Sequence, residues 1–310
     1  MLPAPLRIAI ALLFTLWLSL SAAADPTQTG RLPPGVSVPV PLPLGISVIG
    51  GAPSDDRKIV GIAFAQQGET RVCSGLYVSA RRILTAAHCT CGATNYRVTN
   101  ENFDKGKFRI AAFVSRFGNY NCNDSRYIPR GDDLALLEIV QPLWSTEIAT
   151  ACPQYSLLPA IAFAAHWFPT PPENISVAGY GFSGSAAQDL GSRQEAVVSL
   201  DSVLCATGQA RGLSCLPFAE FIAGATPVRG IARDTCGGDS GGPAFFRARG
   251  NFIPFGVISR ALPVNHRFPD KACGSGGVYT HLGRSDVLAW LRREGVPDGE
   301  PNCGAADVTE

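Results

Sequence analysis

Short apolar runs of strand length, separated by residues that favour turns, make up most of the chain after its proline-rich N-terminal part. Runs of this length, rich in β-branched and aromatic residues, are typical of β-strands rather than helices. The predicted strands are Lys58–Ala65, Gly75–Ser79, Ile83–Ala86, Phe108–Ser115, Leu134–Ile139, Ile175–Ala178, Ala196–Leu204, Pro243–Arg247 and Phe252–Ser259.

Helical spacing of apolar residues is evident only near the C-terminus. Val287, Leu288 and Leu291 fall on one face of the segment Ser285–Arg293, and Ser285 is placed to cap its N-terminus. Many short strands followed by one helix predict an all-β protein, built as β-barrels or as a sandwich. The same order of elements argues against a βαβ fold.

The N-terminal segment has the pattern of a secretory signal peptide. Arg7 precedes the apolar run Ile8–Leu20, and the small residues Ser21–Ala24 follow it. Because the run is too short to span a bilayer comfortably, we expect cleavage after Ala24 rather than a membrane anchor. Residues 1–24 are interpreted as a signal peptide, and no later segment is long and apolar enough to serve as an anchor.

Residues 25–47 are rich in proline, with Leu32-Pro33-Pro34-Gly35 followed closely by Val38-Pro39-Val40-Pro41. Such a sequence favours extended polyproline conformations and does not build a core. We interpret it as a propeptide or linker. The composition changes at Val48-Ile49-Gly50-Gly51, where the folded domain is expected to begin.

The charge and the cysteine content narrow the class of protein. A formal net charge of +1 argues against a nucleic-acid partner, which requires a concentrated basic face. Ten cysteines in a chain with a signal peptide predict disulfides in an oxidising compartment, extracellular or periplasmic. The closely spaced Cys89 and Cys91 lack a matching second pair of ligands, so no zinc site is expected.

The segment Cys236-Gly237-Gly238-Asp239-Ser240-Gly241-Gly242-Pro243 is suited to hold a nucleophile. Glycines allow the backbone around Ser240 to adopt dihedral angles that other residues avoid. The amides of Gly238 and Ser240 are then placed to stabilise an oxyanion. Taken alone, a glycine-rich turn with a serine is more often a simple connection between strands.

His88, in Thr85-Ala86-Ala87-His88-Cys89, and Asp133, in Asp132-Asp133-Leu134-Ala135-Leu136-Leu137, are the candidate base and its partner. A single histidine in an apolar setting is more often a core residue, and a single aspartate before a strand is more often a turn residue. An acid that enters an apolar strand is nevertheless costly unless a partner stabilises it.

Together, the TAAHC stretch, the D-L-A-L-L stretch and GDSGGP resemble the trypsin/chymotrypsin family of serine peptidases, in the family's order of His, Asp and Ser. The resemblance covers roughly Val48 to Gly295. It implies two packed six-stranded antiparallel β-barrels with a C-terminal helix and an active site in the cleft between the barrels. We therefore expect a peptidase domain at residues 48–298 and a C-terminal tail at residues 299–310.

The resemblance implies a role for each matched residue. Ser240 is the expected nucleophile, His88 the general base and then acid, and Asp133 the group that orients His88. Asp133 is preferred to Asp132 because it directly precedes the Leu-Ala-Leu-Leu run. Ser259 matches the family serine that lies near the aspartate and begins the strand on which the substrate pairs.

The resemblance also implies disulfide pairs. Cys73 is expected to pair with Cys89, and Cys236 with Cys273 across the specificity pocket. The remaining cysteines allow many connectivities. The pairs Cys205–Cys215, Cys91–Cys122 and Cys152–Cys303 are guesses.

Substrate preference is inferred from the matched pocket positions. Asp234 lies six residues before Ser240, where trypsin-like members carry the acid that binds Arg or Lys side chains. Gly277 is expected to keep the pocket open to a long side chain. Alternatively, Asp234 forms an internal ion pair. Arg260 replaces the usual tryptophan of the Ser-Trp-Gly motif and could lie across the pocket toward Asp234.

In the family, cleavage frees an apolar N-terminus whose ammonium pairs with the aspartate before the nucleophile. Here that pair would be Val48 and Asp239, which makes the full chain a zymogen. Ser47 precedes the cleavage point, so activation by a trypsin-like cut after Arg or Lys is not expected.

The sequence as a whole predicts a secreted, monomeric serine endopeptidase that needs no cofactor or metal and acts on protein or peptide substrates, with protein inhibitors as possible partners. An inactive homologue that serves as a binding module is the alternative. An esterase of the α/β-hydrolase type does not fit the order of the motifs. The sequons at Asn123 and Asn174 have meaning only in a eukaryotic host.

Overall fold

The structure is a computed structural model of the chain, and it describes residues 48–105, 107–123, 131–139, 155–165, 172–182, 190–263 and 273–299. The predicted signal peptide and propeptide, together with Cys152 and Cys303, lie outside the described residues.

The first barrel is a closed antiparallel sheet in the order β2-β3-β4-β7-β6-β5. Gln67 and Gly68 join β2 to β3 with positive φ angles of 52° and 83°, which a tight two-residue hairpin requires. Its strands are β2 (Ile59–Gln66), β3 (Glu69–Tyr77), β4 (Arg82–Thr85), β5 (Ala93–Thr99), β6 (Arg109–Arg116) and β7 (Ala135–Ile139).

The second barrel closes through the order β8-β9-β10-β13-β12-β11 and the pairing of β11 with β8. The short strand β1 (Ala52–Pro53) pairs with the first two residues of β9, Gln194 and Glu195. The six strands of this barrel are β8 (Asn174–Gly179), β9 (Gln194–Ser202), β10 (Glu220–Ala223), β11 (Pro243–Ala248), β12 (Asn251–Ala261) and β13 (Gly277–His281).

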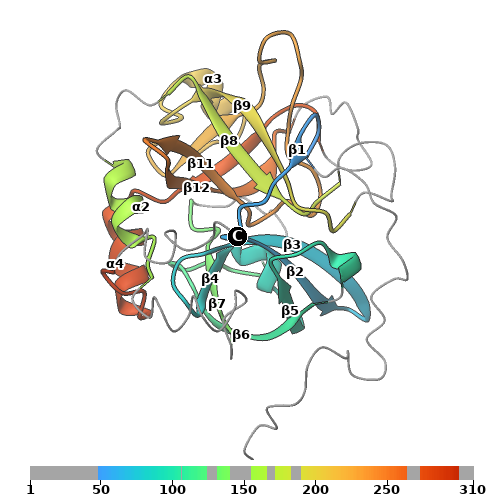
Figure 1. Cartoon of the computed structure of the whole chain (residues 1–310). Helices are drawn as coiled ribbons and strands as arrows, with labels where there is room; N and C mark the ends of the chain where they lie inside the picture. Colours follow the sequence, from blue (N-terminus) through green and yellow to red (C-terminus); the bar gives the residue numbers. More distant parts are fainter. Residues whose placement is uncertain are drawn as a thin grey trace, which may run out of the picture. The chain divides into compact units, whose positions relative to one another are not determined.

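The predicted fold of two six-stranded antiparallel barrels with a C-terminal helix is therefore confirmed (Figure 1). Figure 1 shows α4 (Ser285–Arg293) beside α2 (Leu158–Ala165), a helix that the sequence did not predict. The other helical segments are α3 (Gly208–Gly212) and the 3₁₀ turns η1 (Ala87–Thr90) and η2 (Phe103–Lys105).

Two local predictions were wrong. The cap residue of α4 is Arg284 rather than Ser285, and no side chain caps the helix there. The strand predicted at Gly75–Ser79 begins earlier, at Glu69, because the tight turn after β2 lets polar residues pair along that strand.

The apolar core runs through both barrels and extends under the C-terminal helix. Trp290 of α4 is buried against Phe117, with the ring centroids 5.4 Å apart, and its indole N–H donates to Ser115 Oγ at 3.2 Å. The helix thus packs on the end of β6.

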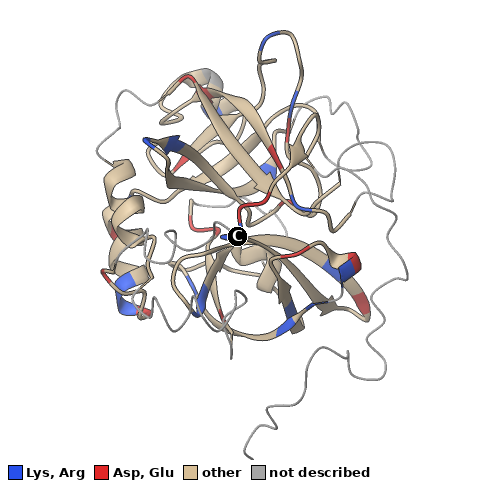
Figure 2. Cartoon of the chain, in the orientation of Figure 1, with Lys and Arg blue, Asp and Glu red and all other residues tan. Residues whose placement is uncertain are grey.

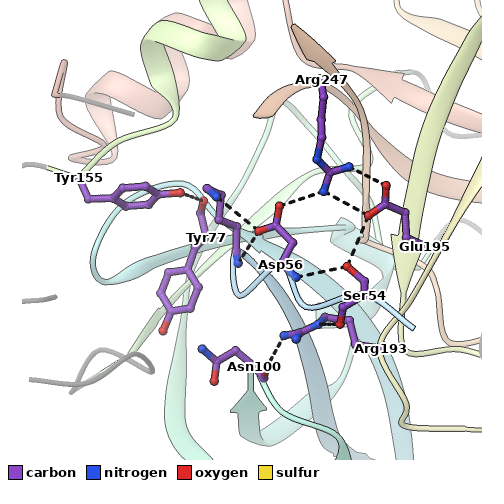
Figure 3. Close-up of polar contacts among 9 residues, drawn as sticks. Ser54, Asp56, Tyr77, Asn100, Tyr155, Arg193, Glu195 and Arg247 are labelled. Carbon is purple, nitrogen blue, oxygen red and sulfur yellow. Dashed lines mark hydrogen bonds and ion pairs between the residues drawn. The ribbon is translucent and has the colours of Figure 1, made fainter. Parts of the chain in front are cut away.

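A polar cluster joins the two barrels near the start of the folded domain (Figure 3). Arg193, just before β9, donates from Nε to Ser54 O at 2.7 Å and also bonds the carbonyl of Asn100, which follows β5. Arg247 of β11 contacts Glu195 at 2.6 Å and Asp56 at 3.3 Å. These contacts hold the segment that leads from β1 into β2.

Acidic and basic residues are interspersed over the elements of both barrels, as Figure 2 shows. This mixture accords with the net charge of +1. None of the helices that the structure describes is long and apolar enough to cross a membrane.

Candidate active site

His88 lies in the turn η1 that follows β4, and Asp133 lies just before β7. The register of these strands pairs Thr85 with Ala135, which brings the two segments side by side. Asp133 Oδ1 accepts the backbone N–H of His88 at 2.9 Å, and Oδ2 lies 2.9 Å from His88 Nδ1. One carboxylate therefore holds both the backbone and the ring of the histidine.

Asp133 is completely buried, and a third donor comes from the other barrel. The hydroxyl of Ser259 on β12 donates to Oδ2 at 2.6 Å. Burial by itself would raise the pKa of Asp133, but the attraction of the His88 ring and the hydrogen bonds from His88 and Ser259 hold this pKa below its usual range. The group is thus an ionised acceptor rather than a turn residue.

The glycines around Ser240 are required by close packing. Gly238 and Gly241 have φ angles of +97° and +86°. A Cβ at Gly241 would collide with the side chain of Thr85 and the backbone of Ser74, and one at Gly242 would collide with the carbonyl of Ala178. Only glycine fits where the loop passes this near to both barrels.

Contacts from both barrels hold the Ser240 loop. Ser74 of β3 donates its N–H to the carbonyl of Ser240 at 2.8 Å and its hydroxyl to that of Gly238 at 2.9 Å. From the second barrel, the carbonyl of Ile258 accepts the N–H of Gly241 at 2.8 Å. The sequence did not identify Ser74; the only signal was a serine within an otherwise apolar stretch.

The carbonyls of the peptides that precede Gly238 and Ser240 are also hydrogen-bonded, one from outside the loop and one from within it. The carbonyl of Gly237 accepts from Phe182 N at 3.0 Å, and that of Asp239 accepts from Gly242 N at 2.8 Å. In a trans peptide the C=O and N–H groups point in opposite directions. The N–H groups of Gly238 and Ser240 therefore point away from the groups that hold these carbonyls, and no hydrogen bond from either amide is found among the described residues.

Asp239 is buried behind this loop. Its carboxylate accepts the N–H groups of Gly181 and Cys236, each at 2.8 Å. Burial raises the pKa of Asp239 to about 7, although these donors oppose the shift. Val48 is also buried, and Ile49 N donates to the carbonyl of Asp234 at 2.9 Å. The pair between Asp239 and the ammonium of Val48 requires a cleaved chain and stays a prediction.

Asp234 is buried with only 2% of its surface exposed. One oxygen accepts the amides of Gly274, Ser275 and Gly276 at 2.7, 3.1 and 2.9 Å, and the other accepts that of Thr235 at 2.7 Å. Burial raises the pKa of Asp234 to about 6, against the effect of these amides. The alternative of an internal ion pair is not observed, because no cation of the described residues pairs with Asp234.

Gly277 lies at the start of β13, beside Asp234's neighbour Thr235. A Cβ on Gly277 would lie 3.3 Å from the carbonyl of Arg260 and 3.5 Å from Thr235 Oγ1. A side chain at this position would therefore be crowded, and the role of Gly277 in the pocket wall stays a prediction.

Arg260 does not reach toward Asp234, which corrects the orientation considered from the sequence. Its guanidinium forms a bidentate pair with Glu220 of β10, at 2.8 and 2.9 Å, and also donates to the carbonyl of Ser214. Glu220 is completely buried and also accepts the N–H of Leu216 at 2.8 Å. The signal in the sequence was Glu220 at the start of an apolar run, because a buried carboxylate is costly unless a cation or other donors stabilise it.

Four disulfides lie within the described residues: Cys73–Cys89, Cys91–Cys122, Cys205–Cys215 and Cys236–Cys273. Each matches a pair suggested by the resemblance or offered as a guess. The guess Cys152–Cys303 falls outside the described residues. Cys73, His88 and Cys89 gather closely enough to suggest a metal site, but the two sulfurs are bonded to each other and so are not available as ligands.

Comparison with known proteins places most of the chain in one family. The family model described as Trypsin matches residues 48–290, which is most of the chain. The chain belongs to the trypsin family.

Individual relatives in this family are distant. Serine protease SP24D of Anopheles gambiae is 24% identical over 269 residues, covering 86% of this chain and 87% of that protein. Trypsin Blo t 3 of Blomia tropicalis is 26% identical over 236 residues, covering 74% and 80%. Serine protease 56 of Homo sapiens is 27% identical over 267 residues, covering 83% of this chain but only 40% of the human protein.

Proposed function

We propose that this member of the trypsin family is an active serine endopeptidase in which Ser240, His88 and Asp133 form the catalytic triad. The observation that carries the proposal is the hold of the buried Asp133 carboxylate on both the backbone and Nδ1 of His88. This contact leaves Nε2 of the ring as the site for a proton from the serine hydroxyl.

The proposed reaction proceeds in two stages. Ser240 Oγ attacks the scissile carbonyl carbon while its proton passes to His88 Nε2, and the oxyanion is bound by the amides of Gly238 and Ser240. His88 then gives this proton to the leaving amine as the carbon–nitrogen bond breaks. Water, deprotonated by His88, hydrolyses the acyl-enzyme and regenerates Ser240. Asp133 stays ionised throughout and stabilises the imidazolium.

We further propose that cleavage follows Arg or Lys. The carboxylate of Asp234 is held by four backbone amides and by no protein cation among the described residues. Neutral donors orient a carboxylate without cancelling its charge, so the cation of a substrate side chain can supply the counter-charge. Ser259 and Gly277 would bound the same pocket.

The remaining parts of the proposal concern processing. The signal peptide and proline-rich segment indicate a secreted zymogen, cut between Ser47 and Val48 by a protease that does not require a basic residue there. N-terminal sequencing of the active form should then read Val-Ile-Gly-Gly. Active material that begins at Asp25 would contradict this route of activation.

A fluorophosphonate probe tests the central proposal. Wild-type protein cut at Val48 should be labelled on Ser240 and should cleave peptides, whereas Ser240→Ala should do neither and lose on the order of 10⁶ in turnover. Ser176→Ala, a change at a hydroxyl that bonds Glu195, is the matched control and should keep activity. Unlabelled wild type would favour the inactive homologue that serves as a binding module.

A further inference from the structure

The side chain of Thr90 closes the turn η1, which carries His88. The hydroxyl of Thr90 donates to the carbonyl of Ala87 at 2.6 Å, and Thr90 itself is 3% exposed. Because Ala87 directly precedes His88, this bond spans the catalytic histidine from one side to the other. The orientation of the His88 backbone therefore depends on where Thr90 is fixed.

Arg116 fixes Thr90 from the neighbouring strand. Arg116 donates from Nε to Thr90 Oγ1 at 2.7 Å and from Nη2 to Thr90 O at 2.8 Å. The guanidinium also lies over the ring of Phe113, 4.6 Å from its centroid. A guanidinium that stacks on an aromatic ring and donates two hydrogen bonds to one residue is held in a single orientation.

The same arginine belongs to the part of the barrel that carries Asp133. Arg116 lies opposite Ala135 in the pairing of β6 with β7, and the N–H of Phe117 donates to the carbonyl of Leu134 at 2.9 Å. These pairings begin one residue beyond Asp133. Arg116 thus connects the turn that carries His88 to the strand β7 that follows Asp133. This connection is separate from the hydrogen bonds between the two side chains.

We propose that Arg116, acting through Thr90, is a positioning residue that sets the alignment of His88 with Asp133. This inference rests on the proposed triad. The hydrogen bonds between His88 and Asp133 join the two side chains directly. The Arg116–Thr90 contact joins the chain segments that carry them. Without it, the turn can shift while the barrel stays closed.

Two other contacts limit how far the turn could move. Tyr96 donates its hydroxyl to the carbonyl of Thr90 at a longer 3.4 Å, and the disulfide Cys91–Cys122 ties the next residue to the loop after β6. Loss of Arg116 should therefore misalign His88 rather than release it. Misplacement of a catalytic group by a fraction of an ångström to 1 Å costs on the order of 10- to 100-fold in rate.

The test compares variants of the protein cut at Val48. Arg116→Met keeps the aliphatic stem and removes the guanidinium, and Thr90→Val removes only the hydroxyl. Each should lower kcat on a peptide substrate about tenfold or more while KM changes less than about twofold. Thr90→Ser should restore kcat to near wild type, and Arg116→Lys should restore only part of it. Arg116→Met with Thr90→Val should cost no more than the larger single loss.

Arg247→Met is the matched control. Arg247 also stacks on a phenylalanine, with Phe245 at 4.8 Å, and also pairs through its guanidinium, but with Glu195 of β9 and with Asp56, which lies between β1 and β2. This variant should lose thermal stability comparable to Arg116→Met and keep its kcat. Equal kcat losses in the two arginine variants, or an unchanged kcat in Arg116→Met, would overturn the inference.

A measurement on the histidine ring separates this inference from the proposed function. The ¹⁵N NMR signals of His88 report which ring nitrogen carries the proton. Wild type should show one tautomer, protonated at Nδ1, and Arg116→Met a mixture, while Arg247→Met should match wild type. If wild type is not labelled by fluorophosphonate, the enzyme proposal fails, yet a mixture in Arg116→Met alone would still support the positioning role. Identical ring signals in all three proteins would refute it.

Discussion

The hydroxyl of Ser259 on β12 donates a 2.6 Å hydrogen bond to Oδ2 of Asp133, the same oxygen that faces His88 Nδ1. Asp133 and His88 belong to the first barrel and Ser259 to the second. The carboxylate is thus shared across the two barrels, and a change at Ser259 should affect the geometry of the triad without touching the nucleophile.

Ser259→Ala should lower kcat about tenfold and destabilise the fold by about 1–3 kcal/mol, because Asp133 would lose one donor in a fully buried setting. The pKa of Asp133 is depressed in the folded chain, so its contribution to stability is present at neutral pH and is lost as pH falls through that pKa. Because the Ser259 hydrogen bond helps to lower that pKa, the stability difference between wild type and the variant should be largest near neutral pH and should shrink as Asp133 becomes protonated on acidification. Urea unfolding from pH 3 to pH 7 measures this; superimposable profiles would argue against the hydrogen bond.

Asp239→Asn should change the pH dependence of stability of the uncleaved chain. Burial raises the folded pKa of Asp239 to about 7, above its unfolded value of about 4, so the folded chain holds more protons between these limits. Stability contributed by Asp239 must then fall as pH rises from about 4 to about 7 and stay constant above. Relative to wild type, the asparagine variant should gain stability across that window.

The control for this prediction is Asp234→Asn, whose window should end lower because the pKa of Asp234 is about 6. Urea unfolding of the uncleaved Ser240→Ala chain at pH 4.5, 5.5, 6.5 and 7.5 avoids autolysis. A difference between Asp239→Asn and its parent that stays constant over this range would show that Asp239 is not the group that titrates.

Asp234→Ser should reduce kcat/KM on substrates with Arg or Lys by at least about 10², because a buried cation would lose its charge partner. The preference of wild type for Arg over a neutral side chain of similar length should rise as pH increases through about 6, when Asp234 ionises. Taking the ratio of the two substrates removes the effect of His88. A profile dominated by Phe, Leu or Ala, unchanged in Asp234→Ser, would contradict the preference for basic residues.

Arg260→Trp should destabilise the chain strongly, since Glu220 would be left fully buried without its bidentate partner. Breaking a buried pair by removing one side costs about 3–5 kcal/mol, whereas replacing both with apolar residues is often neutral. Adding Glu220→Met should therefore recover most of the lost stability. Thermal unfolding of both single variants and the double variant checks this, and additive losses would show that the pair is not coupled.

Much of the candidate site could be predicted from the sequence because its requirements are local. Gly238 and Gly241 have positive φ angles, and no side chain fits at Gly242. The conformation of the loop around Ser240 is therefore specified by consecutive residues of the loop itself. Short apolar runs between turn residues likewise predicted β2, β7 and β12 to within a few residues.

Elements without such a local signal were missed. β5 carries Thr94, Asn95 and Arg97 among its apolar residues, and β10 is only four residues long, so neither has a clear period. The apolar helix α2 contains a proline and no polar face, which conceals helical spacing. Their structure follows from the neighbours that they pair with or cover.

The sequence by itself determined that this chain carries the motifs of the trypsin family in the family's order. It also determined that the loop around Ser240 is rich in glycine. Only the tertiary structure decided which partners the charged residues take. Three of the four amides on Asp234 come from residues 274–276, the partner of Arg260 is Glu220, and Arg116 bonds Thr90. The physical reason is that a motif reports constraints within a few bonds of the backbone, whereas these pairs form only when barrel closure and strand register bring distant segments together.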